Sequence, residues 1–114
     1  MSVKIALLQA NPLVGDITGN SELIERLSRI AKESGAGIAV TSELVISGYP
    51  PRDLLLQSDF ITYCQKTALG LKSPIPILVG TPLEPITDRG LPGNGVVRTG
   101  DSVREITRKQ LLPT

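Results

Sequence analysis

Two ionisable residues, Glu43 and Lys109, stand where an α/β protein can place side chains for acid-base chemistry. Glu43 follows an apolar segment and precedes a sharp turn at residues 48–51, and Lys109 ends a predicted strand. Because the chain contains no histidine, proton transfer must use a carboxylate, a lysine, a tyrosine or a thiol. On position alone, a solvated loop carboxylate and a surface lysine are the simpler interpretations, and spacing does not pair the two residues.

Three further residues have side chains suited to binding or catalysis. Cys64 lies in a predicted amphipathic helix, where cysteines are mostly unreactive packing residues, so we predict no nucleophilic role for it. Tyr49 stands between glycine and proline, where it either fills a packing gap or lines the mouth of a pocket. Asp16 is interpreted as a turn residue. No glycine pattern matches a phosphate-binding loop or a dinucleotide fingerprint, so we predict no cofactor or metal site in this segment.

The composition predicts one modest domain and argues against several classes of partner. The 114 residues are 40% hydrophobic, enough for a small core. The 12 basic and 11 acidic residues give a net charge of +1 without runs of either sign, which argues against nucleic acid and membrane surfaces. The chain has one cysteine, no signal-peptide pattern at its start and no apolar run of the roughly 20 residues that span a bilayer. We therefore expect a protein of the reducing cytoplasm.

The segments that must position these residues alternate between strands and helices. Residues 3–8 and 37–41 are short apolar runs that predict strands, the first buried on both faces. Residues 11–19 predict a loop between them, followed by a helix that Asn20 or Ser21 caps and Gly35 ends. A strand-helix-strand crossover of this kind is typical of a parallel sheet.

The second half of the chain predicts a helix, a third strand and a hairpin. Pro51 is suited to a helix start, and residues 59–71 predict a longer helix. One side of that helix is expected to carry Phe60, Tyr63, Cys64, Thr67, Ala68 and Leu71. Residues 76–80 predict a strand and 83–95 a loop, and 95–98 and 102–107 predict a hairpin whose turn contains Gly100.

Several segments in order carry a family pattern: IALLQANPLVGDITGN at 5–20, GYPPRDLLL at 48–56 after Glu43, ILVG at 77–80, Asn94, and RKQLLP at 108–113. Together they resemble the N-terminal part of a carbon-nitrogen hydrolase of the nitrilase superfamily. Within that superfamily the sequence most resembles the glutaminase domain of glutamine-dependent NAD synthetases. The segment around Glu43 with its GYPP turn is the most specific of these pieces.

This resemblance implies an α/β fold that forms the N-terminal half of a four-layer α-β-β-α sandwich, with a mixed sheet and helices on one face. Residues 1–114 would be a partial glutaminase domain that stops after the lysine motif, without the ATP-dependent synthetase domain. Glu43 would be the general base, Lys109 would stabilise the oxyanion, and Tyr49 would help to wall the glutamine pocket. ATP and magnesium would be required only in the absent synthetase domain.

Departures from the family pattern shape the functional expectation. The family's nucleophilic cysteine lies downstream of the lysine motif, and Cys64 does not occupy its position. Ser42 stands where many members have proline, and Arg52 where an acidic residue is common. Glutamine is expected as the substrate of the complete domain. We expect the isolated chain to be inactive, and to form homo-oligomers or to associate with the missing remainder.

Two alternative functions stay open at this point. The chain is also consistent with a non-catalytic interaction or regulatory module derived from such an enzyme. A fragment of another amidase, acting on small linear amides, is the second alternative. The GYPP turn argues against that second alternative.

Overall fold

The chain forms a five-stranded mixed sheet with two helices, in a computed structural model that describes residues 2–48, 57–86, 93–100 and 104–109. The strands are β1 (Ile5–Leu8), β2 (Ile38–Thr41), β3 (Ile77–Leu83), β4 (Gly93–Thr99) and β5 (Glu105–Arg108), in that spatial order. The first three strands are parallel, and β4 and β5 run antiparallel to their neighbours. The predicted mixed sheet is therefore confirmed.

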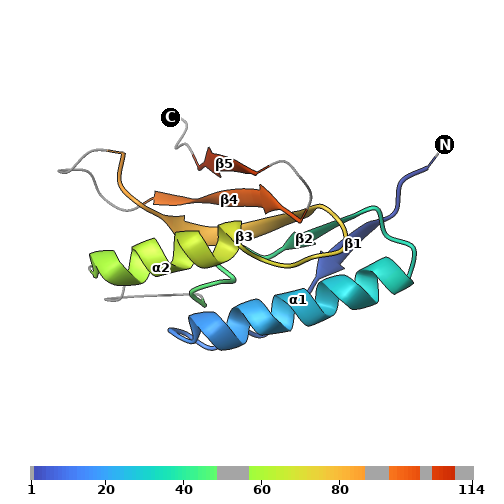
Figure 1. Ribbon diagram of the computed structural model, residues 1–114, viewed down its shortest axis with the longest axis horizontal. Helices are drawn as coiled ribbons and strands as arrows, with labels where there is room; N and C mark the ends of the chain where they lie inside the picture. Colours follow the sequence, from blue (N-terminus) through green and yellow to red (C-terminus); the bar gives the residue numbers. More distant parts are fainter. Residues whose placement is uncertain (1, 49–56, 87–92, 101–103, 110–114) are drawn as a thin grey trace, which may run out of the picture.

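Both helices, α1 (Ile17–Glu33) and α2 (Ser58–Leu69), lie against the same face of the sheet (Figure 1). The core between them and the strands contains side chains that are at most 1% exposed, among them Ile24 from α1, Ile61 from α2 and Val79 from β3. An apolar stripe on each helix is buried in this way because each helix has only one neighbouring layer. The predicted α/β fold with helices on one face is confirmed.

The opposite face of the sheet is open. Register places Leu7, Val40 and Leu78 side by side on this face, and Leu7 is 72% exposed. Ile5 is 58% exposed on the same strand. The prediction that residues 3–8 form a strand buried on both faces is therefore wrong, because only one helical layer covers the sheet in the described part of the chain. This asymmetry fits half of an α-β-β-α sandwich.

Helix α1 begins earlier than the sequence analysis predicted. Its N-cap is Asp16, whose carboxylate accepts a hydrogen bond from the backbone N–H of Gly19 at 3.0 Å. The predicted caps, Asn20 and Ser21, lie inside the helix and are buried. The expectation of a loop through residue 19 was wrong. Asp16, Asn20 and Ser21 are all of types that favour N-caps, and the helix uses the first of them, Asp16.

Helix α2 and the hairpin also differ from their predictions in detail. The buried side of α2 carries Ile61, Cys64 and Ala68, whereas Tyr63, predicted on that side, is 49% exposed. The hairpin is confirmed, and Gly100 adopts the positive φ (+93°) expected of its turn. The predicted loop 83–95 is shorter, because β3 continues to Leu83 and β4 starts at Gly93.

One predicted helix start cannot be compared with the structure. The helix start predicted at Pro51 lies outside the described residues. None of the helices seen in the described ranges has the length and hydropathy that crossing a membrane would require.

Candidate active site

Glu43 lies just beyond the carboxyl end of β2, in a turn that crosses over β3. Two hydrogen bonds attach this segment to Gly80. The Gly80 N–H donates to the Thr41 hydroxyl at 3.0 Å, and the Gly80 C=O accepts from the Ile46 N–H at 3.3 Å. A Cβ at position 80 would lie 2.5 Å from the Ser42 carbonyl oxygen. Glycine is required here because the backbone that carries Glu43 passes directly over β3.

The backbone directly after Glu43 is strained. Leu44 has φ +55°, a left-handed conformation that is uncommon for a residue with a side chain. Leu44 is only 6% exposed, and Val45 and Ile46 are fully buried. Burial of three apolar side chains supports a conformation that would otherwise cost free energy, as is often seen at functional sites. The turn therefore presents Glu43 in one direction.

A buried asparagine connects the Glu43 turn to the first loop. The Asn20 side chain, 3% exposed, accepts from the Leu13 N–H at 2.9 Å and donates to the Leu13 and Ile46 carbonyl oxygens at 2.8 and 3.0 Å. The Gly15 N–H donates to the Ser47 carbonyl at 2.8 Å and joins the same two segments. The residue that sequence reasoning assigned to a helix cap thus fixes the turn that carries the candidate base.

Lys109 reaches the same place from the end of β5, an edge strand of the sheet. It follows β5, and its backbone N–H donates to the Asn94 carbonyl at 2.8 Å, which extends the β4–β5 pairing by one residue. The Lys109 Nζ lies 3.4 Å from Glu43 Oε1. The Lys109 side chain is 57% exposed and the Glu43 side chain 52% exposed. The structure therefore brings together the predicted acid and amine, while their catalytic roles stay predictions.

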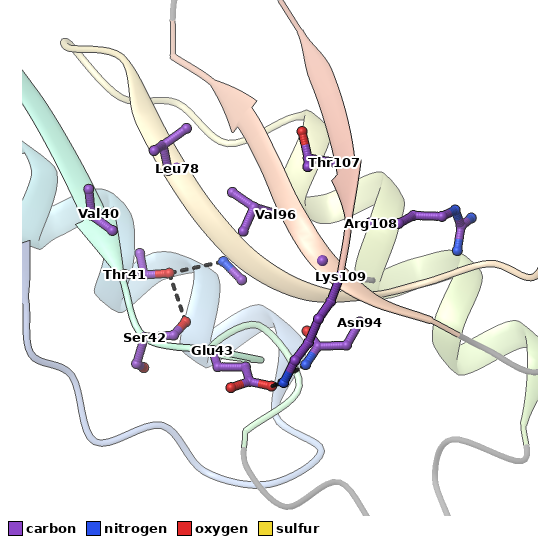
Figure 2. A pocket seen from close by; sticks show the side chains of 12 residues that line it. Val40, Thr41, Ser42, Glu43, Leu78, Asn94, Val96, Thr107, Arg108 and Lys109 are labelled. Atoms are coloured by element: carbon purple, nitrogen blue, oxygen red, sulfur yellow. Dashed lines mark hydrogen bonds and ion pairs between the residues drawn. The ribbon is translucent and has the colours of Figure 1, made fainter. Parts of the chain in front are cut away.

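Asn94 is a third polar group at this position, and sequence reasoning did not assign it a role. Its side-chain amide donates a hydrogen bond to Glu43 Oε1, the oxygen that also faces the Lys109 ammonium. Figure 2 shows the three side chains converging at one end of the pocket. The signal that could have found it was the place of Asn94 among the family-pattern residues, to which no role was attached.

These side chains line a pocket on the open face of the sheet, with a volume of about 350 Å³. Its apolar walls are Val40, Leu78 and Val96, and its polar end holds the Glu43–Lys109 pair. A cavity of this size with a few converging polar groups is suited to a small ligand. The charges can bind or polarise an amide, and the apolar wall can pack against its aliphatic part.

Cys64 does not join this group in the structure. Cys64 is fully buried on the helix-covered side, and burial raises the pKa of its thiol to about 12. A thiol that stays protonated at neutral pH is a poor nucleophile, as expected of a packing residue. Tyr49 lies outside the described residues. Among the residues that are described, no three histidine, cysteine, aspartate or glutamate side chains gather where they could hold a metal ion.

Comparisons with known proteins point to one family, although no family model matches the sequence. A glutamine-dependent NAD(+) synthetase from Synechocystis sp. is 34% identical over 119 residues, covering 96% of this chain and 21% of that protein. The synthetase of Aquifex aeolicus is 44% identical over 64 residues, covering 56% of this chain and 11% of that protein.

Solved structures give the same result. Glutamine-dependent NAD+ synthetase from Acinetobacter baumannii superposes with a TM-score of 0.82 at 28% identity, over 99% of this chain and 22% of that one. A mutant amidase of the nitrilase superfamily from Nesterenkonia superposes with a TM-score of 0.75 at 23% identity, over 98% of this chain and 45% of that one, which shows the shared fold.

The chain therefore has the fold that this nitrilase-superfamily amidase also has. In sequence it is a homologue of the glutamine-dependent NAD(+) synthetases, as the sequence resemblance indicated. The chain spans about a fifth of the length of the Synechocystis protein and a smaller fraction of the Aquifex one.

Proposed function

We propose that the chain is the N-terminal portion of a glutaminase domain, which hydrolyses the side-chain amide of glutamine and supplies ammonia for NAD synthesis. The observation that carries this proposal is the contact between Glu43 and Lys109, 3.4 Å apart at one end of a pocket of suitable size. The homology to glutamine-dependent NAD(+) synthetases supports the choice of glutamine.

The proposed chemistry divides between residues of this chain and a cysteine from outside it. Glu43 accepts the proton of the attacking thiol, and the thiolate adds to the amide carbon. Lys109 stabilises the negative charge that develops on the amide oxygen. The C–N bond then breaks, ammonia leaves with the proton that Glu43 returns, and water hydrolyses the thioester. Tyr49 is proposed to help wall the pocket.

The open face of the sheet also requires an explanation, and we propose that the remainder of the domain covers it. Leu7 and Ile5 are largely exposed there. The superposed Nesterenkonia amidase has more than half of its length beyond the matched 45%. A second layer over the open face would bury these side chains and remove water from around Glu43, whose side chain is half exposed here.

The wider setting follows from the same proposal. ATP and magnesium would act in a separate synthetase domain, where the ammonia is consumed. The protein would work in the cytoplasm, where the free thiol of Cys64 stays reduced.

A chimera tests this proposal directly. All 114 residues replace the matching segment of the Synechocystis protein, and ammonia release from glutamine is measured with the parent protein as the control. We expect the chimera to release ammonia and the isolated chain to release none. A folded chimera without activity, beside an active parent, would refute the proposal. Ammonia release by the isolated chain that disappears in Cys64→Ser would refute both the proposal and the packing role of Cys64.

A further inference from the structure

We propose that Asn94 is a positioning residue that orients the Glu43 carboxylate and fixes the backbone of Lys109, an inference that rests on the proposed function. Its side-chain amide donates to Glu43 Oε1, and its backbone carbonyl accepts from the Lys109 N–H at 2.8 Å. One residue of β4 therefore contacts two groups that are 66 residues apart in the sequence.

The direction of these contacts gives the two oxygens of Glu43 different roles. Asn94 and Lys109 both face Oε1, and within the described residues no hydrogen bond reaches Oε2. Figure 2 shows the second carboxylate oxygen pointing away from both groups. We therefore assign proton transfer to Oε2, whereas Oε1 holds the carboxylate in place.

An amide is suited to this position for a chemical reason. Glu43 is half exposed and its side chain has several rotatable bonds, so an ion pair alone would leave it in several conformations. An uncharged amide adds a directional hydrogen bond without a further charge next to the pair. Aspartate would place a second negative charge against Glu43, and leucine of similar size would remove the donor.

The position of Asn94 is itself fixed by close packing of the strands. Asn94 pairs with Pro82 of β3 and is followed by Gly95. A Cβ at Gly95 would lie 2.3 Å from the Thr107 carbonyl oxygen and 2.5 Å from Leu83 Cδ1. This close approach of β4 to β5 brings the Lys109 backbone within hydrogen-bond distance of Asn94.

Kinetics of the chimera described above test the inference. Asn94→Leu is expected to lower kcat for glutamine hydrolysis by about tenfold to a hundredfold, with KM changed less than about threefold, because the residue positions the base and does not bind substrate. Gln65→Leu is the matched control, since Gln65 is also a hydrogen-bonding amide but lies on α2, where it accepts from the Glu84 N–H at 2.9 Å and does not line the pocket. The control should keep kcat within about twofold.

A second measurement separates this inference from the proposed function. Carbon-13 relaxation of the Glu43 side chain in the 114-residue chain is expected to show greater mobility in Asn94→Leu than in the unchanged chain or in Gln65→Leu. Asn94→Ala replaces Asn94→Leu if the larger side chain disturbs the strand. Unchanged Glu43 mobility, or an unchanged kcat in an active chimera, overturns the role of Asn94. An inactive unsubstituted chimera overturns the proposed function, and the relaxation data then still decide whether Asn94 orders Glu43.

Discussion

The two faces of the sheet differ in what covers them, and the difference decides which polar groups are available for chemistry. On the covered face, α1 and α2 pack over the sheet and Cys64 is fully buried, which raises the pKa of its thiol to about 12. On the open face, Glu43 and Lys109 keep about half of their exposed area and line a pocket. Cys64, which has the most nucleophilic type of side chain in the molecule, therefore lies on the covered face, where its thiol stays protonated.

Two ion pairs on the open face allow a finer comparison. Arg98 and Glu105 lie 3.7 Å apart with side chains 38% and 62% exposed, and Glu43 and Lys109 lie 3.4 Å apart with similar exposure. As exposed pairs, both contribute little to stability. The Arg98–Glu105 pair consists of direct neighbours across a hairpin, whereas Glu43 is held by a strained turn and by Asn94. Positioning, and not charge, distinguishes the candidate site.

The largest expected effect is on catalysis, because only one of the two pairs is expected to act on substrate. In the chimera, Glu43→Gln and Lys109→Met should each lower the rate of ammonia release by about a hundredfold or more. The matched pair of changes, Arg98→Gln with Glu105→Gln, should lower it by less than about threefold. Steady-state kinetics with glutamine would measure this, and equal losses for both pairs would contradict the assignment of the site.

The next effect sharpens the role of the strained turn. Gly80→Ala places a Cβ 2.5 Å from the Ser42 carbonyl oxygen, so the turn or β3 must move. We expect the free energy of unfolding to fall by about 1–3 kcal/mol, as for other overpacked positions, measured by denaturant titration.

Gly37→Ala is the control for this change, because its nearest contact would be the end of the Val3 side chain at 3.4 Å. A loss at Gly37 as large as the loss at Gly80 would show that the result reflects general glycine effects and not the Glu43 turn.

The open face itself can be tested by self-association. Without a covering layer, the isolated chain should form dimers or larger assemblies through the apolar side chains of this face. Leu7→Lys should weaken association by about tenfold or more in sedimentation velocity, because Leu7 is 72% exposed on the open face of β1. Tyr63→Lys, on helix α2 over the covered face and 49% exposed, should leave it unchanged. A monomeric parent chain with cooperative melting would contradict this prediction.

The order of the elements was predictable because each strand and helix is specified locally by its own apolar pattern and by glycine or proline at its ends. The exposure of β1 was not predictable from its own residues, because an apolar strand has the same sequence whether its second face is covered by this chain or by another segment. The start of helix α1 also depends on tertiary contacts that local sequence does not specify. Asp16 and Asn20 can both cap a helix, but Asn20 is used to bond Leu13 and Ile46.

The candidate site was predictable only in part. Resemblance identified Glu43 and Lys109, but their meeting depends on strand register, which sequence did not specify. A turn centred on Gly100 would place Asn94 opposite Ile106, whereas the observed hairpin pairs Gly95 with Arg108 and so brings Asn94 to Lys109. Asn94 was therefore placed in the family pattern without being assigned a role.

The smallest expected effect concerns the covered face and the pH dependence of stability. Burial raises the pKa of Cys64 in the folded chain from an ordinary value of 9.0 to about 12, so the folded state keeps the thiol proton longer than the unfolded state. The stability that this provides is fully present below about pH 9 and is lost as the pH rises toward 12.

Cys64→Ala removes this titration, and the free-energy cost of the cavity it leaves does not depend on pH. Comparing the two chains therefore separates the contribution of the thiol from that of the lysines and tyrosines, which titrate in the same range in both. The free-energy difference between the parent chain and Cys64→Ala should stay constant from pH 7 to 8 and shrink by about 1.4 kcal/mol by pH 10. Denaturant unfolding across this range would measure it. A difference that stays constant to pH 10 would mean that the thiol is accessible to water, and the contrast between the two faces would then no longer support a packing role for Cys64.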